Sequence, residues 1–81
     1  MFLSNRLRVI RAEQRVSQLR LGLAAGIHPT RLWRIENGYT EPTDPERAAI
    51  ARALDVSEAE VWPAPGDPVG LRSLLVAGGR L

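Results

Sequence analysis

Arginine is the residue type through which this chain is best equipped to bind another molecule. All eleven basic residues among the 81 are arginine, set against nine acids. Residues 1–40 hold seven arginines against two acids, a net charge of +5, whereas residues 41–81 hold four against seven acids, a net charge of −3. A guanidinium group forks onto phosphate oxygens and onto the edge of guanine. A basic half and an acidic half suit a partner that is a polyanion, although the absence of lysine by itself reflects genome composition more simply.

The sequence offers few residues for disulfides, metal binding or catalysis. There is no cysteine, which excludes disulfides and thiolate metal sites. His28 is the one histidine, and without a second ligand at suitable spacing it is interpreted as a helix cap near phosphate. We find no carboxylate pair, no nucleophile with a base and no phosphate-binding glycine loop. The sequence therefore predicts no catalytic residue, no metal, no cofactor and no enzymatic activity.

A short helix is predicted over residues 17–25. Ser17 is a good N-cap, and Leu21 and Ala25 recur at helical spacing behind it. Gly26 then supplies the positive φ that ends a helix. Small Gly22 is expected to let the following helix approach closely.

A second short helix is predicted over residues 28–37. His28 caps its start, Pro29 occupies the first turn, and Leu32 and Ile35 form its apolar stripe. Asn37-Gly38 closes it. Two short helices joined by a tight turn form a helix-turn-helix, whose second helix can enter the major groove of DNA.

These residues resemble the Cro and phage-repressor type of helix-turn-helix family, often called the Xre family. The resemblance rests on Ser17-Gln18, Leu21, Ala25-Gly26-Ile27, Leu32 and Ile35-Glu36-Asn37-Gly38. It continues on both sides of the motif and covers about the first three quarters of the chain. It implies an all-α fold, a compact five-helix lambda-repressor-like bundle containing the helix-turn-helix.

The resemblance also implies which residues meet DNA. Gln18 would touch the backbone, positions 29, 30 and 34 would read bases, and Arg31 would reach a base or a phosphate. Trp33 stands where a small or polar residue is usual, and either packs against the protein or contacts a thymine methyl or a sugar. The predicted DNA-binding residues are Ser17, Gln18, His28, Pro29, Thr30, Arg31, Trp33, Arg34, Asn37 and Tyr39.

The first helix is predicted over residues of about 3 to 14, with Ser4 as a cap. In the family, an arginine at the place of Arg11 pairs with the glutamate that ends the second motif helix, here Glu36. A structural ion pair between them is therefore expected. Arg15 stands where the family has glycine, so the turn there is either slightly strained or different.

The acidic half supplies two more helices and a tail. One helix is expected from a cap at Thr43 or Asp44 to Leu54, with Ala48, Ile50, Ala51 and Leu54 facing inward. Ser57 and Glu60 form a capping box that opens a fifth helix, and Trp62 is expected to plug the core. Residues 1–62 would form the DNA-binding domain. Residues 63–81 would form a proline-rich linker and a short tail, which is a short helix, a dimerisation segment or disordered.

The leading functional prediction is a sequence-specific transcriptional regulator, a repressor that binds a pseudo-palindromic operator on double-stranded DNA as a homodimer. The alternative is an antitoxin-type module whose main partner is a protein, a toxin, and which also regulates its own promoter. Leu19 and Leu23, four residues apart on a face the family leaves fairly polar, favour a protein partner. Neither a signal peptide nor a membrane-length apolar run is found, so the protein is expected in the cytoplasm with the nucleoid.

Overall fold

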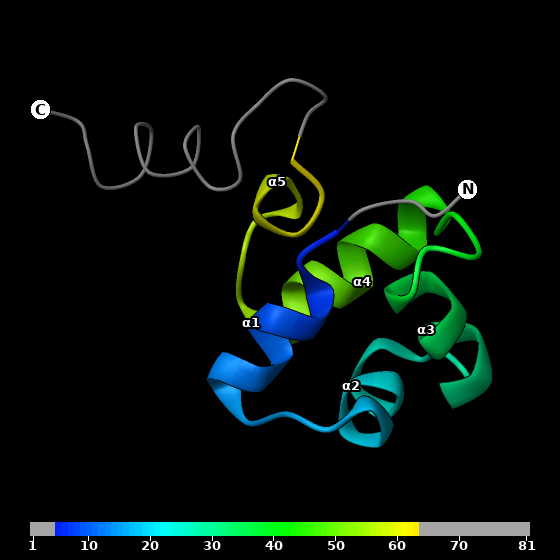
Figure 1. The fold of residues 1–81 in the computed structure, drawn as a ribbon, viewed down its shortest axis with the longest axis horizontal. Helices are drawn as coiled ribbons and strands as arrows, with labels where there is room; N and C mark the ends of the chain where they lie inside the picture. Colours follow the sequence, from blue (N-terminus) through cyan, green and yellow to red (C-terminus); the bar gives the residue numbers. More distant parts are fainter. Residues whose placement is uncertain (1–4, 64–81) are drawn as a thin grey trace, which may run out of the picture.

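The computed structural model describes residues 5–63, and within that range every regular element is a helix (Figure 1). The five helices are α1 Leu7–Gln14, α2 Gln18–Ala25, α3 Pro29–Glu36, α4 Asp44–Leu54 and α5 Glu58–Val61. This confirms the predicted five-helix, lambda-repressor-like bundle. The expectations for the tail fall on residues 64–81, outside the described residues, and the domain boundary at residue 62 stays a prediction.

The α2–turn–α3 unit begins and ends at the residues that the sequence indicated. The Ser17 hydroxyl accepts a hydrogen bond from the Arg20 amide, and Gly26 ends α2 with φ of 71°. Gly22 provides space for the turn itself, since a Cβ there would lie 2.7 Å from the carbonyl oxygen of Ile27 and 3.8 Å from the Leu32 side chain. The nearest neighbour is therefore the backbone of the turn rather than α3.

The start of α1 differs from the predicted start near residue 3, because Asn5 and Arg6 are not helical and the helix begins at Leu7. The predicted cap, Ser4, lies outside the described residues. Asn5 accepts from the Leu7 amide at 2.9 Å and donates to the Ile35 carbonyl at the end of α3 at 3.0 Å. The Arg6 amide donates to the Val61 carbonyl at 2.9 Å. The bonds to Ile35 and Val61 engage Asn5 and Arg6, so these two residues do not extend the first turn of α1. At the other end, Arg15 adopts the left-handed conformation, with φ of 58°.

Both later helices open with a capping box. Ser57 and Glu60 form the predicted one at α5. Thr43 caps α4, and Pro45 takes the second helical position. Glu46 completes that box by accepting from the Thr43 amide at 2.8 Å. The spacing Thr-x-x-Glu is the sequence signal for this second box.

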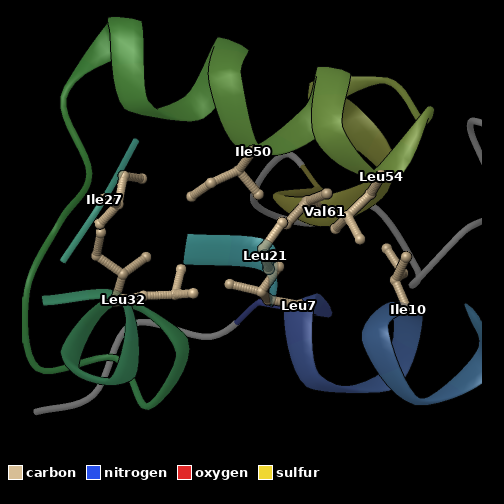
Figure 2. Close-up of a cluster of buried hydrophobic side chains, with 9 residues drawn as sticks. Leu7, Ile10, Leu21, Ile27, Leu32, Ile50, Leu54 and Val61 are labelled. Atoms are coloured by element: carbon tan, nitrogen blue, oxygen red, sulfur yellow. The ribbon is translucent and has the colours of Figure 1, made fainter. Parts of the chain in front are cut away.

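The core consists of nine aliphatic side chains from all five helices and the α2–α3 turn (Figure 2). They are Leu7, Ile10, Leu21, Ile27, Leu32, Ile35, Ile50, Leu54 and Val61. Helix α4 packs against α1, α2 and α5, and α2 packs against α3. Burying each large side chain contributes about 1.5–3 kcal/mol, so this cluster holds the α2–turn–α3 unit against the rest of the fold.

A charged side chain lies at the edge of the core. The guanidinium of Arg47 lies 5.4 Å from the ring centre of Trp62, a cation–π arrangement. Trp62 is half-buried against the core, and Ala48 is also half-buried, less than expected. Helices in the described part of the chain are all too short or too polar to cross a membrane.

Candidate nucleic-acid interface

Helix α3 packs with one face and exposes the other. Leu32, Ile35 and Glu36 are buried on the packed face. Pro29, Thr30, Trp33 and Arg34 are all exposed, and in Figure 1 the helix lies on the outside of the fold beside α2. The predicted base-reading positions therefore share the solvent-facing side of one helix, which an extended partner could approach.

The start of α3 is shaped by a histidine cap. His28 Nδ1 accepts from the Thr30 amide at 3.1 Å, and Pro29 occupies the first helical position, where its missing N–H leaves no bond unmade. His28 thus acts as the predicted cap. The cap holds Thr30 at the exposed end of the helix.

Arg31 lies at the side of this surface and contacts α4. Its Nε and Nη2 donate to the two carboxylate oxygens of Glu46 at 2.5 and 2.8 Å, a bidentate ion pair. The hydrogen bonds from Arg31, together with those from Thr43, lower the pKa of Glu46 to about 2. The same carboxylate therefore caps α4 and ties it to α3. Sequence reasoning missed this role of Glu46, since nothing local marks a partner fifteen residues away.

Glu36 is the centre of a buried polar network beneath the surface. Its side chain is 1% exposed, and Arg11 donates to it through Nε at 2.6 Å and Nη2 at 3.0 Å. The expected ion pair between α1 and α3 is thus present, and the hydrogen bonds that Arg11 donates to Glu36 raise the pKa of Arg11. Arg11 Nη1 also donates to the Val16 carbonyl at 2.8 Å. One arginine therefore ties together α1, the α1–α2 link and the end of α3.

The same network includes the residue that was expected to touch the DNA backbone. Gln18 Nε2 donates to Glu36 Oε1 at 2.9 Å. Gln18 therefore lies at the junction of α2 with the end of α3, and its bond to Glu36 orients the side-chain amide. Ser17, next to it, caps α2 with its hydroxyl and is exposed.

The loop after α3 is held by several bonds. Asn37 Nδ2 donates to the Trp33 carbonyl at 2.9 Å, while its Oδ1 accepts from Arg8 at 2.6 Å. Gly38, with φ of 79°, lets the chain reverse, and the Tyr39 amide donates to the Arg34 carbonyl at 2.9 Å. The Tyr39 ring then stacks on that of Trp33, with centroids 5.5 Å apart and planes 15° apart. Sequence reasoning named both aromatic residues but not their contact.

The arrangement as a whole is an exposed surface on a helix-turn-helix, held from within by hydrogen bonds and a buried ion pair. Arg34 is exposed on it, and among residues 5–63 its side chain forms no ion pair. Beneath it, Arg11, Gln18, Glu36 and Asn37 fix the relative positions of the first three helices. Such a surface can bind an anionic duplex through guanidinium, hydroxyl and aromatic groups.

Comparison with known proteins agrees with this geometry. The helix-turn-helix family matches residues 7–61, more than half of the chain. The chain belongs to the helix-turn-helix family of the Cro and phage-repressor type. Members of this family are DNA-binding regulators, and this helix-turn-helix protein is a DNA-binding transcription regulator.

Solved structures of regulators share the fold of this helix-turn-helix protein. The restriction-modification controller protein C.AhdI from Aeromonas hydrophila is 26% identical with a TM-score of 0.64, covering 65% of this chain and 80% of that one. The P22 c2 repressor, in complex with a synthetic operator, is 26% identical with a TM-score of 0.68, covering 72% and 88%. SinR, in its complex with SinI, is 27% identical with a TM-score of 0.63, covering 67% and 53%. Comparison with curated protein sequences gave no match.

Proposed function

We propose that this helix-turn-helix protein is a transcriptional repressor that binds a pseudo-palindromic operator as a homodimer, with residues 28–37 in the major groove. The observation that carries the proposal is the exposed face of α3, which presents Thr30 and Arg34 while Leu32 and Ile35 anchor the opposite face. The P22 c2 repressor, which shares the fold, was solved with a synthetic operator. Two such helices in one dimer would meet half-sites about 34–36 Å apart.

The exposed side chains divide into two roles under this proposal. Arg34 forks onto a guanine and Thr30 meets an adjacent base edge, with Pro29 in van der Waals contact. We assign the loop residue Tyr39 and the caps at the helix starts, Ser17 and His28, to phosphate contacts, which would set the register. Gln18 and Asn37 join the same backbone contacts, already oriented by their bonds to Glu36 and to the Trp33 carbonyl.

Arg31 has a divided role in this assignment. Its Nε and Nη2 hold Glu46, so Nη1 is the group that we assign to a phosphate. An ion-paired arginine adds less net attraction than a free one, because the carboxylate cancels most of its charge at a distance. We therefore expect Arg31→Ala to weaken binding less than Arg34→Ala.

The proposal is tested first by selecting bound sites from random duplex DNA and measuring their affinity against salt. We expect a site with two-fold symmetry that binds two chains. For 6–10 phosphate contacts, the affinity should fall by about 10³ to 10⁵ between 50 and 200 mM salt. A response that is flat with salt, or selection of no preferred site, would contradict the proposal.

The second test replaces Arg34 by alanine. We expect the binding free energy to weaken by ~1–3 kcal/mol and the base preference to relax at one base pair only. Arg52→Ala is the matched control, because Arg52 is an exposed arginine in the last turn of α4, away from the end of that helix that contacts α3. Equal weakening on all sequences would reassign Arg34 to a phosphate.

A protein partner is the second candidate function, and one surface feature favours it. Leu19 and Leu23 are both exposed, one turn apart on α2, where nothing in the described range covers them. SinR, which shares the fold, was solved in complex with SinI. If this helix-turn-helix protein is an antitoxin-type module, a second small protein should co-purify with it, and the pair Leu19→Ser and Leu23→Ser should release that protein. A clean homodimer would count against this function.

A further inference from the structure

Two aromatic rings form an exposed stack at the end of α3. Trp33 is 46% exposed and Tyr39 is 54% exposed. Their rings lie nearly parallel, 5.5 Å apart between centroids. Large aromatic side chains left in water on so small a domain mark a contact surface. Trp33 is therefore not part of the buried core, and its ring packs on that of Tyr39.

The stack lies on the same face as the residues assigned to bases. Trp33 is one helical turn beyond Pro29 and Thr30 and directly precedes Arg34, and Leu32 and Ile35 point the other way into the core. Residues three and four apart on a helix lie side by side. A duplex that touches Thr30 and Arg34 therefore comes within reach of the indole.

The indole is held in place before any partner arrives. Asn37 donates to the Trp33 carbonyl and the Tyr39 amide donates to the Arg34 carbonyl, each at 2.9 Å. Between them, Gly38 reverses the chain. These bonds bring the Tyr39 ring onto one face of the Trp33 ring. Backing by a second ring limits the rotamers of the indole, so less conformational entropy is lost on contact.

We propose that Trp33, backed by Tyr39, is a specificity-determining residue that contacts the 5-methyl group of a thymine in the major groove. The proposal rests on the proposed DNA binding. The methyl group of thymine is the one apolar group that base edges present in that groove. An indole offers a broad apolar surface and a single N–H donor, with no acceptor, so it matches a methyl group better than it matches the polar edge of any base. The neighbouring arginine supplies the attraction that brings the groove to it.

The test uses the selected binding site and replaces each thymine in turn by uracil, which removes the methyl group and keeps every hydrogen-bonding group of the base. For the wild-type protein, we expect one or two positions per half-site at which uracil weakens binding about fourfold, the equivalent of one buried methyl group. For Trp33→Ala, uracil and thymine should bind equally at those positions. Tyr39→Ala should reduce the uracil effect, because the indole loses its backing.

Thr30→Ser is the matched control, since it removes the only other side-chain methyl group assigned to the bases and keeps the hydroxyl. Whatever Thr30→Ser does to overall affinity, the ratio of thymine to uracil binding at those positions should equal that of the wild type. Unfolding curves of each variant check that the fold persists, which we expect because Trp33 lies outside the core.

The outcomes separate this inference from the function beneath it. Tight, sequence-selective binding with no position sensitive to uracil overturns the thymine contact and leaves the repressor proposal standing. A uracil effect that survives Trp33→Ala and disappears in Thr30→Ser also overturns it, because the threonine then reads the methyl. Failure to bind any duplex selectively refutes the proposed function instead.

Discussion

Removing the charge of Glu36 is the most demanding test of how this fold is held together. Its carboxylate is 1% exposed and accepts from Arg11 at 2.6 and 3.0 Å and from Gln18 at 2.9 Å. In Glu36→Gln the side chain keeps its size, but the guanidinium of Arg11, itself largely buried, loses its counter-charge. Breaking a buried pair in this way costs about 3–5 kcal/mol.

That loss is large compared with the whole stability of the protein. At about 0.05–0.15 kcal/mol per residue, the 59 residues that the structure describes give a free energy of unfolding of ~3–9 kcal/mol. We therefore expect Glu36→Gln to be partly unfolded at 25 °C or to melt more than about 12 °C lower. Urea unfolding followed by circular dichroism measures the change at equilibrium.

Arg8 provides the control within the same cluster. It lies 3.7 Å from the Glu36 carboxylate, but its side chain is 66% exposed. An exposed pair contributes about 0–1 kcal/mol, so Arg8→Gln should hardly move the urea midpoint. A double-mutant cycle with Arg11→Met and Glu36→Gln should be non-additive, since each single variant already leaves its partner unpaired. A loss below 1 kcal/mol in Glu36→Gln, or one equal to that of Arg8→Gln, would refute the role of the buried pair.

Three further substitutions test local features of the fold. Arg15→Gly should raise the free energy of unfolding by about 0.5–1 kcal/mol, because glycine adopts the left-handed φ of 58° without the Cβ clash. Thr43→Ala should lower it by about 0.5–2 kcal/mol through loss of the α4 cap. Glu46→Gln keeps a capping-box residue but loses the ion pair with the partly exposed Arg31, so it should lower the free energy of unfolding at neutral pH. Because the pKa of Glu46 is lowered from 4.5 to about 2, the contribution of this ion pair is complete above pH 4.5 and is lost as the pH falls toward 2.

The measurements follow directly. Thermal and urea unfolding at pH 7 measure the first two changes, with Asp55→Gly, at φ of 57°, as a parallel to Arg15→Gly. If Arg15→Gly instead lowers the free energy of unfolding, the Arg15 side chain makes a contact that stabilises the fold by more than the left-handed backbone destabilises it. For Glu46→Gln, the difference from the wild type should be greatest at pH 6–7 and vanish near pH 2. A difference that stays constant with pH would assign the effect to the cap rather than to the charge.

Much of the candidate site was predictable because its signals are local. Ser17, Gly26 and the His28-Pro29 pair set the bounds of α2 and the start of α3 through bonds that reach no more than five residues. Apolar spacing in α3 then decides which face is exposed, and with it the positions that we propose to meet DNA. The ion pair of Arg11 and Glu36 lies beyond such local signals, and it was expected only because the motif resembles a known family.

Only the tertiary structure decided which residues far apart in the chain come into contact. Asn5 reaches the end of α3, 30 residues away, and moves the start of α1; Gln18 reaches Glu36, and Arg31 reaches Glu46. Caps and apolar periodicity are set by neighbours within about one helical turn, so the sequence by itself determined the helices, the turn and the exposed face. Which polar groups then meet depends on how the nine core side chains seat one helix on another, and that is a property of the packed chain alone.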